Sequence, residues 1–334
     1  MNQIAVCIGN IIVYWSSVVI FFGIAASFAL SYALYTSHGG RGSALWLFLP
    51  LAIFFSVILA RAVHWYCHME QYAGFWRAMT DYSQGDYCLH GALLGAVLAA
   101  LVVRLLGFTQ NLGRLFDCLA PGAALCIAFI RLSALFNTSC RSKIVVTNPL
   151  LQHLPLASGI PTANGGTEYR FATFFIQFLV MLILLWILLR FFYCRRRYPM
   201  KNDYPRDGHV GLMFLVYYDA VEVVLDSTRY DSSFLPFNGF ISLTQILCAL
   251  IILGVFILYS VRSVKANGLQ PRHWVMWVCF FLTVAGTGVF EYLVQRFGNL
   301  YLFCYSAMSV TLFLMAFIVN RMYRSVCADI YEKA

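Results

Sequence analysis

The chain has 334 residues, of which 61% are apolar and only 11% are charged, and its mean hydropathy is +0.75. This composition excludes an ordinary soluble protein, because soluble domains carry about 25% charged residues. The net charge of +9 does not indicate nucleic-acid binding, since the basic residues fall in short loops between apolar runs. The sequence therefore predicts an all-α, polytopic membrane helical bundle.

Apolar runs of about 20 residues, the length that a helix needs to cross a bilayer, recur along the whole chain. They predict nine spans, at residues 11–35, 44–66, 88–107, 116–137, 171–193, 210–226, 240–260, 273–293 and 300–320. Residues 1–10 lack a basic segment and a small-residue cleavage site, so we expect the first hydrophobic stretch to remain as a span.

The distribution of lysine and arginine favours an outside N-terminus and a cytoplasmic C-terminus. With that orientation the cytoplasmic loops, including the dense loop at 195–206, hold about twice as many basic residues as the outer loops. Two outer segments are long, at 67–87 and 138–170. The second contains three prolines and an Asn-Gly-Gly turn, which predicts a small extracytoplasmic cap.

We expect a seven-span membrane domain at residues 1–262, with its cap at about 138–170, followed by a C-terminal two-helix extension and cytoplasmic tail at 263–334. The eleven cysteines form no Cys-x-x-Cys pair and most lie in apolar runs, which is typical of small buried side chains. A disulfide among Cys67, Cys88 and Cys140 stays open, because all three lie near the expected outer surface.

Ionisable side chains inside spans cost about 2.5–3.5 kcal/mol at mid-depth, so each one needs a reason. In the favoured orientation, four spans bring polar groups to one outer level: Arg61, His90, Arg131, Asn137, Glu222, Asp226 and Arg229. Single members can instead reach individually toward lipid headgroups. Their convergence favours an internal polar site.

Three of these groups, Glu222, Asp226 and Arg229, share one helical face because they are spaced at i, i+4 and i+7. Two acids one turn apart repel each other unless a cation compensates, so Arg61 or Arg131 is the expected partner. Arginines, carboxylates and a histidine at headgroup depth suit the binding of a phosphodiester and the transfer of a proton.

A metal or another cofactor is not expected. His90 has no second ligand at helical spacing, and His64 and His68, although four residues apart, have no obvious third ligand. The sequence also contains no nucleophile elbow, phosphate-binding glycine loop or convincing Ser/His/Asp set.

Six short motifs carry a resemblance to a known family. They are Tyr14-Trp15, Ala60-Arg61 with His64-Trp65-Tyr66, Leu89-His90-Gly91-Ala92-Leu93, the segment from Arg131 to Asn137, the segment from Asp226 to Asp231, and Thr244-Gln245. In their order and spacing, over about 11–260, the sequence resembles the prolipoprotein diacylglyceryl transferases, bacterial plasma-membrane enzymes with seven spans. That family moves the diacylglyceryl group of phosphatidylglycerol onto the lipobox cysteine of a prolipoprotein and releases glycerol phosphate.

The resemblance implies roles for seven residues. Arg131 and Arg229, with Arg61, would bind the phospholipid phosphate. His90 or Asp226 would take the proton of the substrate thiol, and Asn137 and Tyr14 would orient the headgroup. The implied partners are phosphatidylglycerol, other membrane lipid and the prolipoprotein signal peptide, with no nucleic acid and no cofactor.

The sequence departs from the family pattern at several motif positions. Ala92 and Ile130 replace glycines, Ala134 replaces an asparagine, and Ser139 replaces an acidic residue. Glu222 stands where the family has an arginine, and a glutamate there opposes a phosphate electrostatically. A catalytically degenerate protein of the same fold, which binds lipid or a partner, therefore stays open as the alternative. A transporter or channel is less favoured, because the charges gather at one face.

Overall fold

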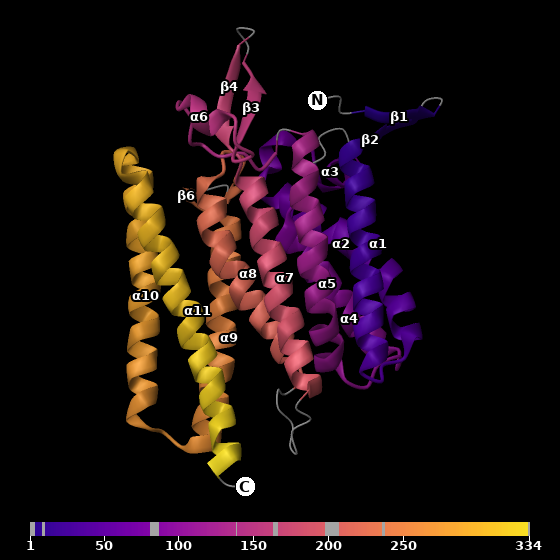
Figure 1. Ribbon diagram of the computed structural model, residues 1–334. Coiled ribbons are helices and arrows are strands. Elements are labelled where there is room, and N and C mark those ends of the chain that lie inside the picture. Colours follow the sequence, from indigo (N-terminus) through magenta and orange to yellow (C-terminus); the bar gives the residue numbers. More distant parts are fainter. Residues whose placement is uncertain are drawn as a thin grey trace.

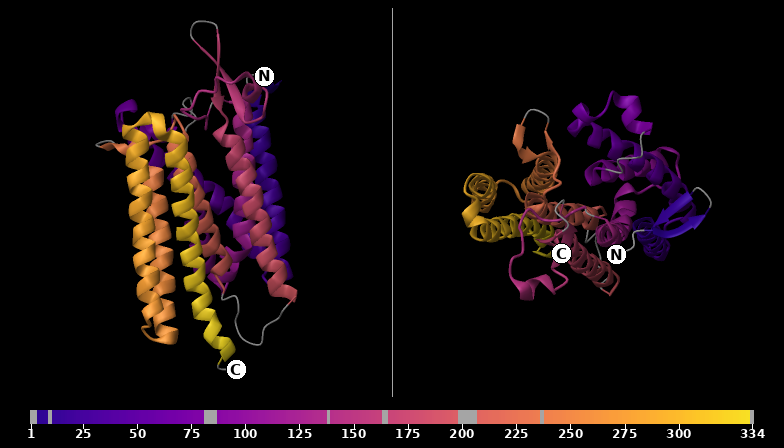
Figure 2. Two further views of the ribbon diagram at one scale, coloured as in Figure 1. Left: turned by 60° about the vertical axis from the view of Figure 1, so that its left-hand side comes forward. Right: turned by 90° about the horizontal axis from the view of Figure 1, so that it is seen from above.

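The computed structural model describes residues 4–8, 11–80, 87–137, 139–162, 166–197, 207–235 and 238–332. It is mostly helical, with long helices side by side and the short strands at one end (Figures 1 and 2). The long helices are α1 (Trp15–Ser37), α2 (Gly42–Cys67), α4 (Leu89–Leu105), α5 (Leu112–Ser133), α7 (Thr173–Arg197), α8 (His209–Thr228), α9 (Leu243–Asn267), α10 (Pro271–Arg296) and α11 (Tyr301–Glu332). The predicted helical membrane bundle is confirmed.

Among the described residues, seven helices are long and apolar enough to cross a membrane, namely α1, α2, α5, α7, α9, α10 and α11. The chain is therefore a multi-pass membrane protein. The other two of the nine expected spans coincide with α4 and α8, which fall outside this set. Helix α4 has only 17 residues, and α8 contains the acids Asp219, Glu222 and Asp226. Most residues of α8 are buried among its neighbours, whereas α4 buries one side and exposes Leu94, Leu101 and Leu105.

The predicted first span began too early. Residues Ile11–Tyr14 form strand β2, which pairs antiparallel with β1 (Ile4–Ile8), and α1 begins only at Trp15. The run Ile11-Ile12-Val13 is β-branched, and such residues favour strands. Hydropathy alone does not separate a short apolar strand from the first turn of a helix.

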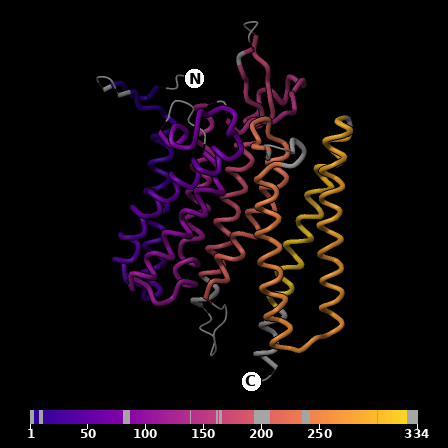
Figure 3. The backbone as a smooth tube through the Cα atoms, turned by 180° about the vertical axis from the view of Figure 1, so that it is seen from behind, coloured from indigo at the N-terminus to yellow at the C-terminus, as the bar shows by residue number. Residues whose placement is uncertain are grey.

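Two hydrophobic cores meet at α8. One core joins α1, α2, α4, α5 and α7 to one side of α8, which contributes Phe214 and Tyr218. The other joins α9, α10 and α11 to its opposite side, through Met213 and Val216. Figure 3 shows α1 and α2 on one flank of the molecule and α10 and α11 on the other. Helix α8 thus lies between the two cores, and its acidic residues are carried into the interior.

Helix α4 packs unusually close to α2 because of two glycines one turn apart. A Cβ on Gly91 would lie 2.5 Å from the carbonyl oxygen of Leu59, and one on Gly95 would lie 2.4 Å from the amide nitrogen of Ser56. The Ser56 hydroxyl also donates a hydrogen bond of 2.7 Å to the carbonyl of Ala92. Small residues allow such backbone contact between membrane helices. The contact fixes the first turn of α4.

The long segment after α5 folds into a small unit at one end of the bundle (Figure 1). It contains the short helix α6 (Pro149–Gln152) and an antiparallel pair of strands, β3 (Ala157–Pro161) and β4 (Thr167–Phe171). Its backbone is bonded to the end of α8, since the Lys143 amide donates to the Thr228 carbonyl at 2.8 Å. We call the described residues from 139 to 172 the cap; Thr138 and 163–165 lie outside the described residues.

Three further connections complete the fold. The expected loop at 67–87 contains a turn of 3-10 helix (Met69–Gln71) and helix α3 (Phe75–Thr80). Strands β5 (Phe234–Leu235) and β6 (Asn238–Ser242) form a hairpin before α9. Most of the basic loop that favours a cytoplasmic C-terminus, from 198 to 206, lies outside the described residues.

Candidate functional site

The carboxyl end of α8 brings two acids and an arginine into the bundle. Glu222 and Asp226 are buried one turn apart, and Arg229 follows the helix directly. The Arg229 Nη1 atom lies 3.7 Å from Asp226 Oδ1 and 3.9 Å from Glu222 Oε1. Asp226 also accepts a hydrogen bond of 2.5 Å from the Ser242 hydroxyl at the start of α9. The predicted shared helical face is thus occupied by one connected group.

Arg131 reaches the same group from the last turn of α5. Its Nη2 atom lies 2.6 Å from Glu222 Oε1, and both side chains are buried. Gln177 of α7 donates to the other oxygen of Glu222 at 3.0 Å. Arg131 is therefore the cation that compensates Glu222, one of the two partners expected from the sequence. Its Nε atom is buried without a hydrogen-bond partner among the described residues.

The start of the cap closes one side of this cluster. The Arg131 Nη1 atom donates to the Cys140 sulfur at 3.1 Å, and the Cys140 amide donates to Asp231 Oδ2 at 2.9 Å. Cys140 has a φ of +56°, in the left-handed region that side chains other than glycine rarely adopt. Such a conformation persists only where the surroundings hold it, and here Arg131 and Asp231 both bond to Cys140.

Asp231 anchors the second arginine. The Nε atom of Arg229 donates to Asp231 Oδ1 at 2.9 Å. Burial raises the pKa of the Asp231 carboxyl. The charge of Arg229 and the hydrogen bonds from Arg229 and the Cys140 amide lower the pKa by more, so it lies below its ordinary value. The carboxylate of Asp231 is thus stabilised in its ionised form.

Asn137 lies in the connection between α5 and the cap. Its Oδ1 atom accepts hydrogen bonds from the Ser139 amide at 3.0 Å and from the Ser139 hydroxyl at 2.5 Å. Tyr14 is exposed and immediately precedes α1. The next residue, Trp15, stacks on Phe136 with a centroid distance of 6.2 Å. The start of α1 therefore lies beside the connection that contains Phe136 and Asn137.

Arg61, at the end of α2, has a different environment from Arg131 and Arg229. It is buried, and its Nε atom donates to the Ala78 carbonyl at 2.7 Å. Its guanidinium group lies 5.5 Å from the ring centroid of Tyr72 and 5.6 Å from that of Tyr87. These contacts are with the segment after α2, whereas Arg131 and Arg229 pair with the α8 acids. Three of the predicted residues form one cluster, because Arg131 and Arg229 both pair with Glu222 and Arg229 also pairs with Asp226.

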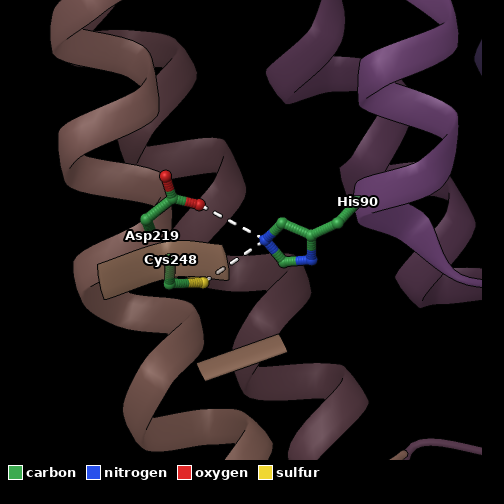
Figure 4. Close-up of side chains that lie close together, drawn as sticks. All are labelled: His90, Asp219 and Cys248. Carbon is green, nitrogen blue, oxygen red and sulfur yellow. Dashed lines mark hydrogen bonds and ion pairs between the residues drawn. The ribbon is translucent and has the colours of Figure 1, made fainter. Parts of the chain in front are cut away.

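His90 begins α4 and meets two residues that sequence reasoning did not pair with it. Its Nε2 atom lies 3.4 Å from Asp219 Oδ1 of α8 and 3.3 Å from the Cys248 sulfur of α9 (Figure 4). A signal for Asp219 was present, because it is an acid within a predicted span. Cys248 gave no such signal, since buried cysteines in apolar runs are common.

The cysteines considered for a disulfide are not paired. Cys67, Cys88 and Cys140 are all free thiols. Cys140 is instead a neighbour of Arg131 in the buried cluster. Sequence reasoning missed this role, as well as those of Gln177 and Asp231, because each depends on how the cap and α7 pack against α8.

Comparison with known proteins identifies the family. The model of the prolipoprotein diacylglyceryl transferase family matches residues 3–261. The chain belongs to this family. The predicted resemblance is confirmed, and α10 and α11 lie beyond the matched part.

Distant relatives of the family are similar over most of the chain. The phosphatidylglycerol–prolipoprotein diacylglyceryl transferase of Oceanobacillus iheyensis is 24% identical over 279 residues, which cover 81% of this chain and 92% of the relative. The protein of the same name from Shouchella clausii is 24% identical over 278 residues, covering 82% of this chain and 94% of the relative. That from Acaryochloris marina is 27% identical over 233 residues, covering 67% and 78%.

Proposed function

We propose that the chain transfers the diacylglyceryl group of phosphatidylglycerol to the lipobox cysteine of a prolipoprotein. Family membership and the activity for which the distant relatives are named support this proposal. The structural observation that carries it is the convergence of Arg131 and Arg229 on Glu222, with a buried N–H on Arg131 that has no hydrogen-bond partner among the described residues. Two arginines in a partly dehydrated site bind a phosphodiester strongly.

In the proposed reaction, Arg131 and Arg229 hold the lipid phosphate, and Arg61 supports the site from α2. The substrate thiolate attacks the glyceryl carbon, an S–C bond forms, and the bond between that carbon and the phosphate-ester oxygen breaks. The electron pair stays on the phosphate oxygen of the leaving glycerol phosphate, whose charge the arginines stabilise. Asp226 or His90 accepts the thiol proton, and Asn137 and Tyr14 orient the headgroup.

The orientation follows from the same proposal. The protein lies in a bacterial plasma membrane with its N-terminus and cap outside and its C-terminus in the cytoplasm, which brings the cluster to the outer leaflet. Residues 1–262 form the transferase-like domain, and 263–334 form the added hairpin and tail. Green fluorescent protein fused after Ala334 tests the orientation, because it fluoresces in the cytoplasm; fluorescence only from an outside reporter at that position would reverse it.

A second function is favoured by the charge of the cluster. Two arginines face three carboxylates, those of Glu222, Asp226 and Asp231, so the formal charge of the group is −1 when all are ionised. A lipid phosphate must then compete with Glu222 for its arginines. The alternative is a catalytically degenerate family member that binds lipid or a protein partner without transferring the diacylglyceryl group.

Rescue of bacteria depleted of their own transferase separates the two functions. Under the proposed function, the chain restores growth and converts unmodified prolipoprotein to the lipidated form on a gel. Arg229→Gln abolishes this conversion, while Arg272→Gln, at an exposed position in α10, retains it.

Failure of the chain to rescue, although it is present in the membrane fraction, contradicts the proposed function. Rescue only after Glu222, Ala134 and Ser139 receive the residues of the family pattern supports the degenerate alternative.

A further inference from the structure

Three different helices bring metal-ligating side chains together next to the arginine cluster. His90 of α4, Asp219 of α8 and Cys248 of α9 are all buried. Their ligand atoms lie within 4.8 Å of one another, and Figure 4 shows the three side chains directed toward one point. Histidine, carboxylate and cysteine are the three side-chain types that bind zinc in proteins.

The arrangement does not fit a proton relay. In a relay, the histidine contacts the acid through one ring nitrogen and the nucleophile through the other. Here the same atom, Nε2 of His90, faces both Asp219 Oδ1 and the Cys248 sulfur. A ring nitrogen either donates one hydrogen or accepts through one lone pair, so it does not satisfy both partners well. The N–O distance of 3.4 Å also exceeds the usual hydrogen-bond range of about 2.7–3.2 Å.

The same distances fit a shared metal ion. Ligands about 2.0 Å (N, O) and 2.3 Å (S) from a tetrahedral zinc ion are separated by about 3.3 Å for N–O and 3.5 Å for N–S. The observed distances are 3.4 Å for His90 Nε2 to Asp219 Oδ1 and 3.3 Å for His90 Nε2 to Cys248 Sγ. The second oxygen of Asp219 is buried without a hydrogen-bond partner among the described residues, and it adds a donor at the same place.

Charge gives an independent argument. Asp219 is fully buried in the bundle, where an ionised carboxylate is costly unless a cation compensates it. A carboxylate and a thiolate together carry a formal charge of −2, which one divalent ion neutralises. The neutral histidine then supplies a nitrogen ligand without adding charge.

We propose that His90, Asp219 and Cys248 bind one zinc ion between α4, α8 and α9. The mixed nitrogen, oxygen and sulfur set favours zinc over magnesium or calcium, which prefer oxygen ligands alone. This site reverses the sequence-based expectation that His90 lacks metal partners, because its partners come from other helices. The site also has a consequence for the reaction, which rests on the proposed function. A metal-bound His90 does not accept the proton of the substrate thiol, so Asp226 is the only acceptor.

Metal analysis of the full-length protein tests the site. The protein is purified in detergent, passed over a weak chelator, and analysed for zinc by mass spectrometry. We expect about one zinc per chain in the unmodified protein, and at least a tenfold loss in Cys248→Ala and in Asp219→Asn. Cys304→Ala is the matched control, because Cys304 is a buried cysteine of α11 outside the cluster.

Cobalt replacement keeps the test decisive if a variant folds poorly. Co²⁺ bound by the unmodified protein is expected to give a thiolate-to-cobalt absorption band, which Cys304→Ala retains and Cys248→Ala loses. The site is overturned if the folded, unmodified protein takes up neither zinc nor cobalt, or if the band survives in Cys248→Ala. The zinc proposal and the proposed function can fail separately. If metal-free protein still transfers lipid, only the zinc proposal fails. If zinc-bound protein transfers no lipid, only the proposed function fails.

Discussion

Arg131 Nη2 lies 2.6 Å from Glu222 Oε1, and this pair is buried at the junction of α5 and α8. A carboxylate of the chain itself therefore occupies an arginine that the proposed function assigns to lipid phosphate. Because Gln177 and Arg229 also approach Glu222, the glutamate is the central acceptor of the cluster. Its charge decides how strongly a phosphate competes for the arginines.

Glu222→Gln is expected to strengthen binding of phosphatidylglycerol. The change removes one negative charge next to the phosphate and keeps an oxygen that accepts from Arg131. We expect the affinity for the lipid to rise about tenfold, or about 1.4 kcal/mol, which is the usual size of the effect of one nearby charge. Binding is measured by equilibrium dialysis against labelled lipid in detergent. Glu168→Gln is the control, since Glu168 pairs with Arg170 in the cap; an equal gain there would contradict the role of Glu222.

Arg131→Ala is expected to destabilise the protein by about 3–5 kcal/mol, because it leaves the buried Glu222 carboxylate without its closest cation. Thermal unfolding followed by intrinsic fluorescence measures the effect. The double variant Arg131→Ala with Glu222→Ala should lose less than the two single changes together. Arg272→Ala, at an exposed position, should leave the midpoint nearly unchanged. Additive losses in the double variant would show that the pair is not coupled.

Gly91→Ala is expected to separate α4 from α2 and to cost about 1–3 kcal/mol, because the added methyl group meets the Leu59 carbonyl. The matched control is Gly254→Ala in α9, where a Cβ meets no described atom within 4 Å. The two midpoints of thermal unfolding are compared in one detergent. A lower midpoint only for Gly91→Ala supports the close contact, and equal midpoints argue against it.

Asp231 is expected to make the attachment of the cap sensitive to acid. Its folded pKa lies below the ordinary value of 3.8, so its contribution to stability is complete above pH 3.8 and is lost as the pH falls through the folded pKa. The difference in thermal midpoint between the unmodified protein and Asp231→Asn should therefore shrink below pH 3.8. Thermal midpoints measured from neutral to acidic pH check this, and a constant difference would contradict it.

The sequence predicted the part of the cluster that lies close together along the chain. Glu222, Asp226 and Arg229 share a helical face, and that spacing alone places them together. Arg131 was one of two possible cations, and helix packing selects it. Arg61 was grouped with them by membrane depth, but depth does not give direction around a helix. Its observed contacts are with Tyr72, Tyr87 and Ala78.

The His90 cluster was not predicted, because its members are far apart in the chain. Asp219 lies 129 residues from His90, and Cys248 lies 158 residues from it. Ligand spacing along one helix cannot reveal a site built from three helices. The early start of the predicted first span has a different cause, since hydropathy does not distinguish the strand Ile11–Tyr14 from the helix that follows it.

Transfer by the purified protein tests the central claim most directly. A lipobox peptide is incubated with phosphatidylglycerol and the detergent-purified chain, and the peptide mass is measured. The proposed function predicts a peptide heavier by one diacylglyceryl group on its cysteine, together with released glycerol phosphate, and no such product with Arg229→Gln. An unmodified peptide, under conditions in which the relative from Oceanobacillus iheyensis modifies it and the chain is folded, would contradict the account.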